Sequence, residues 1–172
     1  MFKRSPILLI ITGLSLFLVG CGGNQVEVTK TSPTVQPLYS EYLDVRNCDS
    51  TKALDKTLSD FLTVQEEVTV SEQATAVSSG KTSPISGAIC KDLRDKVETA
   101  YHQEYQEAQN SVQEIAINVP ADKIHMYKVQ WNKKTFSGSL SFQLEDELYE
   151  TSYTYKLEVP QLDGSFTMSC TA

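Results

Sequence analysis

Hydrophobic and polar residues alternate along most of the C-terminal half of the chain. A period of two is typical of β-strands that bury one face. Short polar segments at 120–122, 132–134 and 145–147 interrupt the alternation, so the pattern predicts an antiparallel β meander with a last short strand ending at Cys170. The apolar positions of the four longer runs are Ile115, Ile117 and Val119; Tyr127, Val129 and Trp131; Phe136, Leu140, Phe142 and Leu144; and Tyr149, Tyr153, Tyr155, Leu157 and Val159.

A helical period precedes these strands. Ser83-Pro84 is typical of a helix start, with serine as the cap and proline in the first turn. The spacing predicts one long amphipathic helix of about 25 residues. The expected fold class is therefore α+β, an antiparallel β meander with one long helix packed on or beside it. The positions that share the apolar face are Ile89, Leu93, Val97, Tyr101, Tyr105, Ala108, Val112 and Ile115.

The region before the helix is less regular. The residue pattern predicts a first strand at 38–47 and a short helix or turn at 51–59. Val64, Val68 and Val70 would share one face of a further strand within 61–70. Serine, threonine, alanine and glycine dominate 71–87, which either continues that strand or forms a loop.

The first twenty residues have the three parts of a secretory signal peptide. Lys3 and Arg4 give a positive start, an apolar run follows at 7–19, and Gly20 is the small residue before Cys21. The apolar run is shorter than the ~20 residues that a membrane-spanning helix needs. We therefore expect export of the chain and removal of residues 1–20.

Leu18, Gly20 and Cys21 resemble the lipobox of bacterial lipoproteins. The resemblance implies cleavage after Gly20 and attachment of diacylglycerol to the Cys21 thiol, often with a further fatty chain such as palmitate on the new amine. Stable anchoring takes two or more membrane-binding signals, and several acyl chains on one residue would meet that requirement. The alternative is an ordinary signal peptide followed by a chance cysteine.

Three regions follow from this organisation. Residues 1–20 are the expected signal peptide, and 21–37 form a polar segment with two prolines that predicts a flexible tether. Residues 38–172 are long enough for a single α+β domain with its own core.

Three cysteines follow Cys21, so one disulfide would leave one thiol unpaired. A bridge between Cys48 and Cys170 would join the first and last strands and close a long loop. Cys48–Cys90 is the alternative pairing, although Cys90 falls within the predicted helix. We expect Cys48–Cys170.

The sequence lacks the common spacings of catalytic and metal-binding residues. His102 and His125 belong to no H-x-x-x-H motif, and C-x-x-C, G-x-S-x-G and glycine-rich phosphate loops are absent. The acidic cluster 145–150 either keeps a hairpin tip soluble or captures calcium. We expect no enzymatic activity, no metal and no cofactor, with a cryptic envelope enzyme as a minor alternative.

Five tyrosines are a further candidate feature. Tyr101 and Tyr105 lie on the predicted helix, and Tyr149, Tyr153 and Tyr155 lie on one strand. They either pack the helix against the sheet, which is the expected arrangement, or form a partner surface, since tyrosine is enriched at interfaces.

Several short motifs are similar to those of a group of uncharacterised exported bacterial domains. They are the segment 45–48 (VRNC), the long polar helix, the V-x-W segment 129–131 and the terminal segment 168–170 (MSC). The resemblance covers most of 40–172. It implies no catalytic residues, because that group has no established activity.

The formal charge of −7, which becomes −9 without Lys3 and Arg4, disfavours nucleic-acid binding. We expect a non-enzymatic interaction or structural module, held by lipid on Cys21 at the cell membrane or outer membrane and facing an extracytoplasmic compartment, with an unknown protein or envelope partner. The rival hypothesis is a pore-forming β-protein, because 64–79 is similar to aerolysin-type insertion segments; Glu66 and Glu72 on its apolar face argue against it. Self-association through the helix is a third hypothesis.

Overall fold

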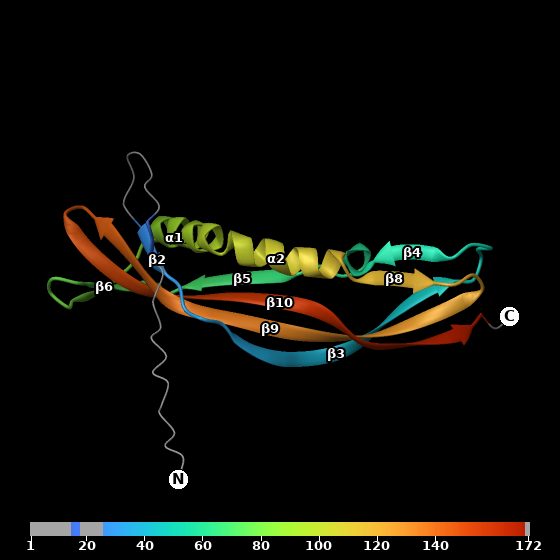
Figure 1. Ribbon diagram of the computed structural model, residues 1–172. Helices are drawn as coiled ribbons and strands as arrows, with labels where there is room; N and C mark the ends of the chain where they lie inside the picture. The colour runs from blue at the N-terminus through green and yellow to red at the C-terminus, as the bar shows by residue number, and fades with distance from the viewer. Residues whose placement is uncertain (1–14, 18–25, 171–172) are drawn as a thin grey trace, which may run out of the picture.

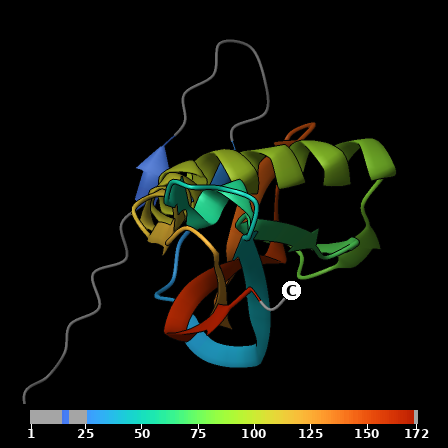
Figure 2. The same ribbon diagram turned by 90° about the vertical axis from the view of Figure 1, so that its right-hand side faces the viewer.

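The computed structural model describes residues 15–17 and 26–170. In this part of the chain an elongated, twisted antiparallel sheet carries two helices along one side (Figure 1), and the view from one end again places the helices above the strands (Figure 2). Strands account for 58% of the described residues and helices for 20%. The fold is therefore mostly β, and the expected α+β class with one long helix is wrong.

One long hairpin forms the centre of the sheet. Strands β9 (Lys123–Leu144) and β10 (Glu147–Ser169) pair from the Leu144–Glu147 turn to the opposite ends of both strands, with one irregularity between Leu162 and Gly164. Glu145 adopts a φ of 56° in the two-residue turn. The 22 residues of β9 span roughly 70 Å at ~3.3 Å per residue.

The remaining strands extend this hairpin at different points along its length. On the β9 side, β2 (Val26–Thr29) pairs near the hairpin turn, and β3 (Thr34–Asn47) pairs with the other half of β9. On the β10 side lie β5 (Gln65–Val70) and β6 (Gln73–Ala76). Two short strands add to the edges: β1 (Ser15–Phe17) beside β2, and β7 (Thr82–Pro84) beside β6.

A small second sheet closes the core next to the end of the helices. It consists of β4 (Leu54–Thr57) and β8 (Ala116–Val119), and the 3-10 helix η1 (Leu58–Asp60) follows β4. Leu58 is fully buried, and its backbone N–H donates to the Ile115 carbonyl oxygen at 2.9 Å. The predicted short helix or turn over 51–59 is thus a strand followed by a 3-10 turn.

The predicted long helix is two helices, α1 (Gly87–Ala100) and α2 (His102–Gln113). They meet at Tyr101, whose φ of −101° and ψ of 10° depart from helical values. The helical region also begins later than expected: Ser86 caps α1, whereas Ser83-Pro84 lies in the edge strand β7, where a proline is tolerated.

The predicted breaks at 120–122 and after Leu144 are present, but the break at 132–134 is wrong because β9 continues through it. The expected last short strand is also wrong, since it is the end of β10. Buried residues of β9 are odd-numbered as far as Trp131 and even-numbered from Phe136 onward. Strands of this length twist, so the face directed at the core changes midway along the hairpin. The alternation of buried positions therefore shifts by one residue without any break in the strand. In the sequence this shift looks like a turn between two strands.

The folded part also begins earlier than expected. Residues 26–29 and 34–37, predicted to belong to the flexible tether, pair with β9. Val28 is 2% exposed and contributes to the core, so the segment has more to bury than its polar composition indicated. Residues 1–14 and 18–25, which include Cys21 and most of the expected signal peptide, lie outside the described residues.

Candidate functional site

The tyrosines singled out in the sequence pack the helices against the sheet. Tyr153 is 3% exposed and Tyr155 is fully buried, and the ring of Tyr155 stacks on that of Tyr101 with 4.6 Å between centroids. Tyr149 is half-buried and stacks on Phe142. The packing interpretation is confirmed for Tyr153 and Tyr155, and these residues do not form a partner surface because they are not accessible.

The buried phenol groups form a short hydrogen-bonded chain. The hydroxyls of Tyr101 and Tyr153 lie 2.8 Å apart, and Tyr153 Oη donates to the Thr29 carbonyl oxygen at 2.9 Å. Burial, followed by the hydrogen bond with Tyr101, raises the pKa of Tyr153 far above its usual value. Burial also raises the pKa of Tyr155. The Glu66 carboxylate raises it further, because it accepts a hydrogen bond from the Tyr155 hydroxyl at 2.9 Å.

This chain is part of a clamp on the start of the folded domain. Lys30 Nζ lies 2.9 Å from Glu104 Oε1 and 4.7 Å from the centre of the Tyr101 ring, which combines an ion pair with a cation–π contact. Gly138 on β9 leaves room for Thr29, since a Cβ atom there would overlap the Thr29 carbonyl oxygen. Thr29 and Lys30 are thereby fixed to the helices and to β9. We call these contacts the N-terminal clamp.

One weak signal of the clamp is present in the sequence. A glycine inside a strand often marks a close approach of another backbone, and Gly138 lies in the middle of β9. Nothing in the local pattern around Lys30 indicates Glu104, because the two residues are 74 positions apart.

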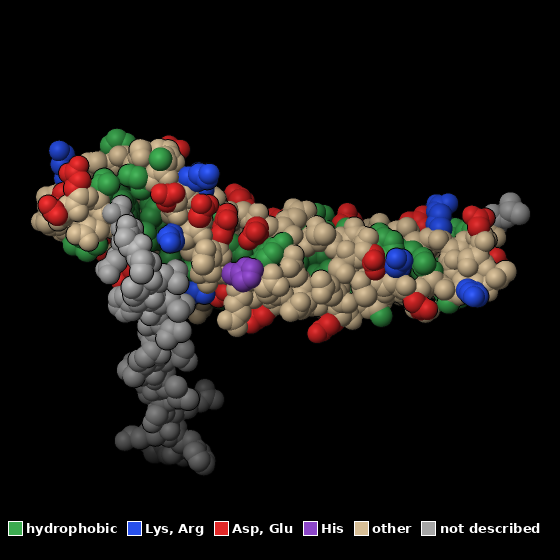
Figure 3. All heavy atoms as spheres, turned by 90° about the horizontal axis from the view of Figure 1, so that it is seen from above, with side chains coloured by type: hydrophobic (Ala, Val, Ile, Leu, Met, Phe, Trp, Pro, Cys, Tyr) green, Lys and Arg blue, Asp and Glu red, His purple; other side chains and the backbone are tan. Residues whose placement is uncertain are grey.

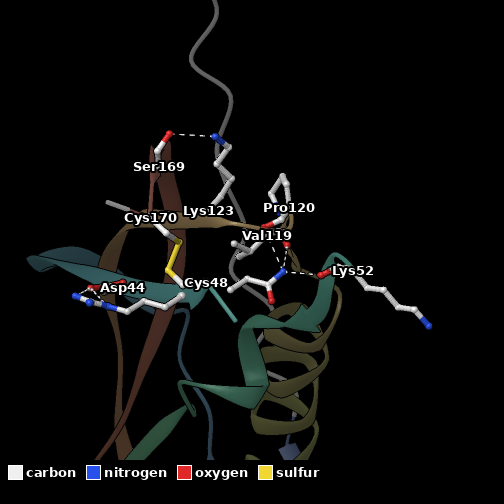
Figure 4. The surroundings of a disulfide bond; sticks show 10 residues. Asp44, Cys48, Lys52, Val119, Pro120, Lys123, Ser169 and Cys170 are labelled. Atoms are coloured by element: carbon white, nitrogen blue, oxygen red, sulfur yellow. Dashed lines mark hydrogen bonds and ion pairs between the residues drawn. A yellow bond between two sulfur atoms is a disulfide. The ribbon is translucent and has the colours of Figure 1, made fainter. Parts of the chain in front are cut away.

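A disulfide closes the opposite end of the molecule (Figure 4). Cys48 and Cys170 are bonded, with their Cα atoms 5.6 Å apart, which confirms the expected pairing. Beside the bridge, the side-chain amide of Asn47 donates to the carbonyl oxygens of Lys52, Val119 and Pro120 at 2.8, 3.0 and 3.2 Å. The ends of β3, β8 and β10 are thus held together. Cys90 is buried in α1 and unpaired, which excludes the alternative Cys48–Cys90 bridge.

Large apolar side chains are exposed near this disulfide-closed end. Tyr42 is 59% exposed, Phe166 50% and Met168 43%. Their strand partners are Lys128, Met126 and Ile124 on β9, and residues directly opposite one another in antiparallel strands share a face. The rings of Tyr42 and Phe166 meet edge to face, with centroids 6.3 Å apart. We call Tyr42, Ile124, Met126, Phe166 and Met168 the distal patch.

Two ion pairs lie beside the distal patch. Arg46 binds Asp44 at 2.8 Å on β3, and Lys128 pairs with Asp163. The Asp44 carboxylate raises the pKa of Arg46, and that of Asp163 raises the pKa of Lys128. An apolar centre with a charged rim is the usual arrangement of a protein–protein interface. By contrast, acidic side chains are scattered along much of the face that carries the helices (Figure 3).

The remaining candidate residues for catalysis and metal binding lie on different elements of the described chain. The described residues contain no group of three or more His, Cys, Asp and Glu side chains that could hold a metal ion. His102 is exposed on α2, and His125 stacks on Tyr127 with ring centroids 4.5 Å apart. Glu145, Asp146 and Glu147 lie at the hairpin turn as expected. None of the helices within 26–170 has the length and hydropathy needed to cross a membrane.

Comparisons with protein-family models, with curated proteins and with solved structures found no match to this chain.

Proposed function

We propose that this chain is a lipid-anchored protein of the bacterial cell envelope that presents the distal patch to a protein partner. The lipid would be carried by Cys21, as the resemblance of Leu18, Gly20 and Cys21 to a lipobox implies. The body would act as a binding arm rather than as an enzyme.

The observation that carries the proposal is the distance between the two ends of the hairpin. Val26, which follows Cys21 by five residues, pairs with Phe142 near the β9–β10 turn. Phe166 of the distal patch pairs with Met126, sixteen positions away along β9, which corresponds to about 50 Å at ~3.3 Å per residue. An anchor on Cys21 would therefore hold one end of the sheet and leave the distal patch at the other.

The N-terminal clamp supports a stiff connection between anchor and arm. Thr29 and Lys30 follow the anchor by fewer than ten residues, and both are fixed to the body by the contacts described above. A flexible tether as far as residue 37 would let the body lie in any orientation. Because the chain is held in the sheet from Val26 onward, the connection to the anchor is much shorter than that.

The chemistry of the distal patch favours a protein partner. Tyrosine, phenylalanine and methionine are enriched at protein interfaces, and an exposed contiguous apolar patch on a monomer usually marks such a site. The formal charge of −7 disfavours phosphate-rich partners. No observation within residues 26–170 favours the pore-forming hypothesis, since β5 and β6 are paired with β10 in the sheet.

The proposal is tested by photo-crosslinking in the native membrane. A photoreactive phenylalanine analogue is placed at Tyr42 or Phe166 in the full-length protein, and at Val77 as the control. Val77 is 52% exposed, but it lies near the hairpin turn. We expect a protein adduct from positions 42 and 166 and none from 77, with the adduct lost when Met168→Glu is added.

Two results would contradict the proposal separately. The same adducts from all three positions, or none from 42 and 166, would remove the partner surface. Mass spectrometry of the mature protein that finds Cys21 without lipid would remove the anchor.

A further inference from the structure

A cavity of 220 Å³ lies where α1 begins, close to the β9–β10 turn. It opens to the surface and is bordered by β6, the segment around β7, the first turn of α1, the end of β9 and the start of β10. Its principal lining residues are Ala74, Ile85, Ile89, Phe142, Leu144 and Tyr149. Phe142 and Tyr149 face each other across the hairpin, and their stacked rings form one wall.

The lining suits an apolar ligand. No charged side chain contributes to it. Two of its polar side chains already have partners, because Ser86 Oγ accepts the Ile89 N–H at 3.4 Å and Tyr149 Oη donates to Glu147 at 3.2 Å. Pockets for whole small molecules usually measure about 300–1,000 Å³. This smaller cavity fits part of a hydrocarbon chain and has no group to bind a charged headgroup.

The cavity also lies within reach of the proposed anchor. Phe142 is the strand partner of Val26, and β2 runs antiparallel to β9, so the N-terminal end of β2 is directed toward the hairpin turn. Five residues separate Val26 from Cys21, and a fully extended chain of that length covers at most ~18 Å. A fatty chain on Cys21 therefore begins close to the cavity at high effective concentration.

We propose that this cavity holds part of one fatty acyl chain carried by Cys21 of the same molecule. This proposal rests on the proposed lipid anchor and specifies where one acyl chain of that anchor binds. The remaining chains stay in the bilayer and retain the protein there. The bound chain would fix the direction in which the body leaves the membrane.

The hairpin turn favours the chain of Cys21 over the chains of surrounding lipids. Glu145 and Asp146 form the turn next to Leu144 at the cavity, and Glu147 follows as the first residue of β10. Acidic side chains are repelled by a negatively charged membrane surface. To take up the acyl chain of a membrane lipid, the acidic turn would have to approach the bilayer. The acyl chain on Cys21 is attached five residues before Val26, so it can reach the cavity without that approach.

The test uses the full-length protein in its own cells. Cells are grown with a fatty acid that carries a photoactivatable diazirine in its hydrocarbon chain, so that the label enters both Cys21 and the membrane lipids. After irradiation, the protein is digested and the crosslinked peptides are identified by mass spectrometry. We expect crosslinks from the Cys21 lipid to peptides that contain 83–89 or 142–149.

A cavity-filling variant provides the matched comparison. Ile89→Trp places an indole in the cavity, whereas Ala88→Trp adds the same group at an exposed position of the same helix. We expect Ile89→Trp to lower the yield of these crosslinks about tenfold, equivalent to ~1.4 kcal/mol, and Ala88→Trp to leave it unchanged. Thermal unfolding of both variants confirms that they are folded.

The outcomes separate this inference from the proposed function. An acylated Cys21 whose chains crosslink only to lipids overturns the inference and leaves the anchor intact. Crosslinks to the cavity that come from membrane lipids rather than from Cys21 also overturn it. A Cys21 that carries no label overturns the proposed function itself.

Discussion

Gly138 has a specific role because it is the point at which the first residues of the folded domain cross β9. A methyl group at Gly138 would overlap the Thr29 carbonyl oxygen and come within 2.6 Å of Tyr153 Oη. We expect Gly138→Ala to displace β2 and to lower the free energy of unfolding by about 1–3 kcal/mol, measured by urea denaturation. Gly164→Ala is the matched control, since nothing lies within 4 Å of its added Cβ. Equal losses in the two variants would refute the proposed close approach.

The buried tyrosines predict a loss of stability at alkaline pH. Burial raises the pKa of both Tyr153 and Tyr155 in the folded protein, whereas a tyrosine in the unfolded chain ionises near pH ~10. Their stabilisation is therefore complete below pH ~10 and decreases as the pH rises further, because the unfolded state loses its protons first. Urea denaturation across this range should show the decrease, and the slope should be smaller in Tyr153→Phe. A slope that is the same in both proteins would contradict the assignment.

The roles of single residues were predictable from the sequence where the residue type or its place in an alternating pattern indicates them. The pairing of Cys48 with Cys170 followed from the ends of two predicted strands, and the structure confirms it. The packing role of Tyr153 and Tyr155 followed from their place on the apolar side of a strand. The contact between Lys30 and Glu104 did not, because a long-range ion pair leaves no periodic pattern.

At the scale of elements, the alternation identified the strands but not their continuity. Asn132, Lys133 and Lys134 were interpreted as a turn, yet they pair with Val159, Glu158 and Leu157. Lysine stems can cover apolar surface while their amines remain in water, so a polar segment can continue a strand where the buried face changes. A short polar segment can therefore mark either a turn or a change of buried face within one strand, and a single sequence does not distinguish the two.

The disulfide should stabilise the elements at the distal end. Cys48 and Cys170 are separated by 122 positions, and a loop of that size corresponds to about 4–5 kcal/mol in the chain-entropy model. We expect the double variant Cys48→Ser, Cys170→Ser to lose about that much stability, measured by chemical denaturation under oxidising conditions. Adding a reductant should destabilise the wild type and leave the double variant unchanged; an equal effect on both would contradict the prediction.

At the scale of the whole molecule, the main result is the separation of two ends. The apolar cavity lies near the hairpin turn and the N-terminal clamp lies further along β9, whereas the disulfide and the distal patch lie at the far ends of β9 and β10. The disulfide was predicted from the sequence and is confirmed, whereas the anchor stays a prediction. Their arrangement depends on a hairpin of more than twenty residues per strand, which was predicted as four separate strands.

The most direct test of this account is the height of each end above the membrane. A fluorescent amino acid is incorporated at position 77 or 166 of the full-length lipidated protein in vesicles, and energy transfer to an acceptor on the lipid headgroups is measured. The account predicts efficient transfer from position 77 and little from position 166, which lies about 50 Å further along the hairpin at ~3.3 Å per residue. Equal transfer from both positions, or stronger transfer from 166, would contradict it.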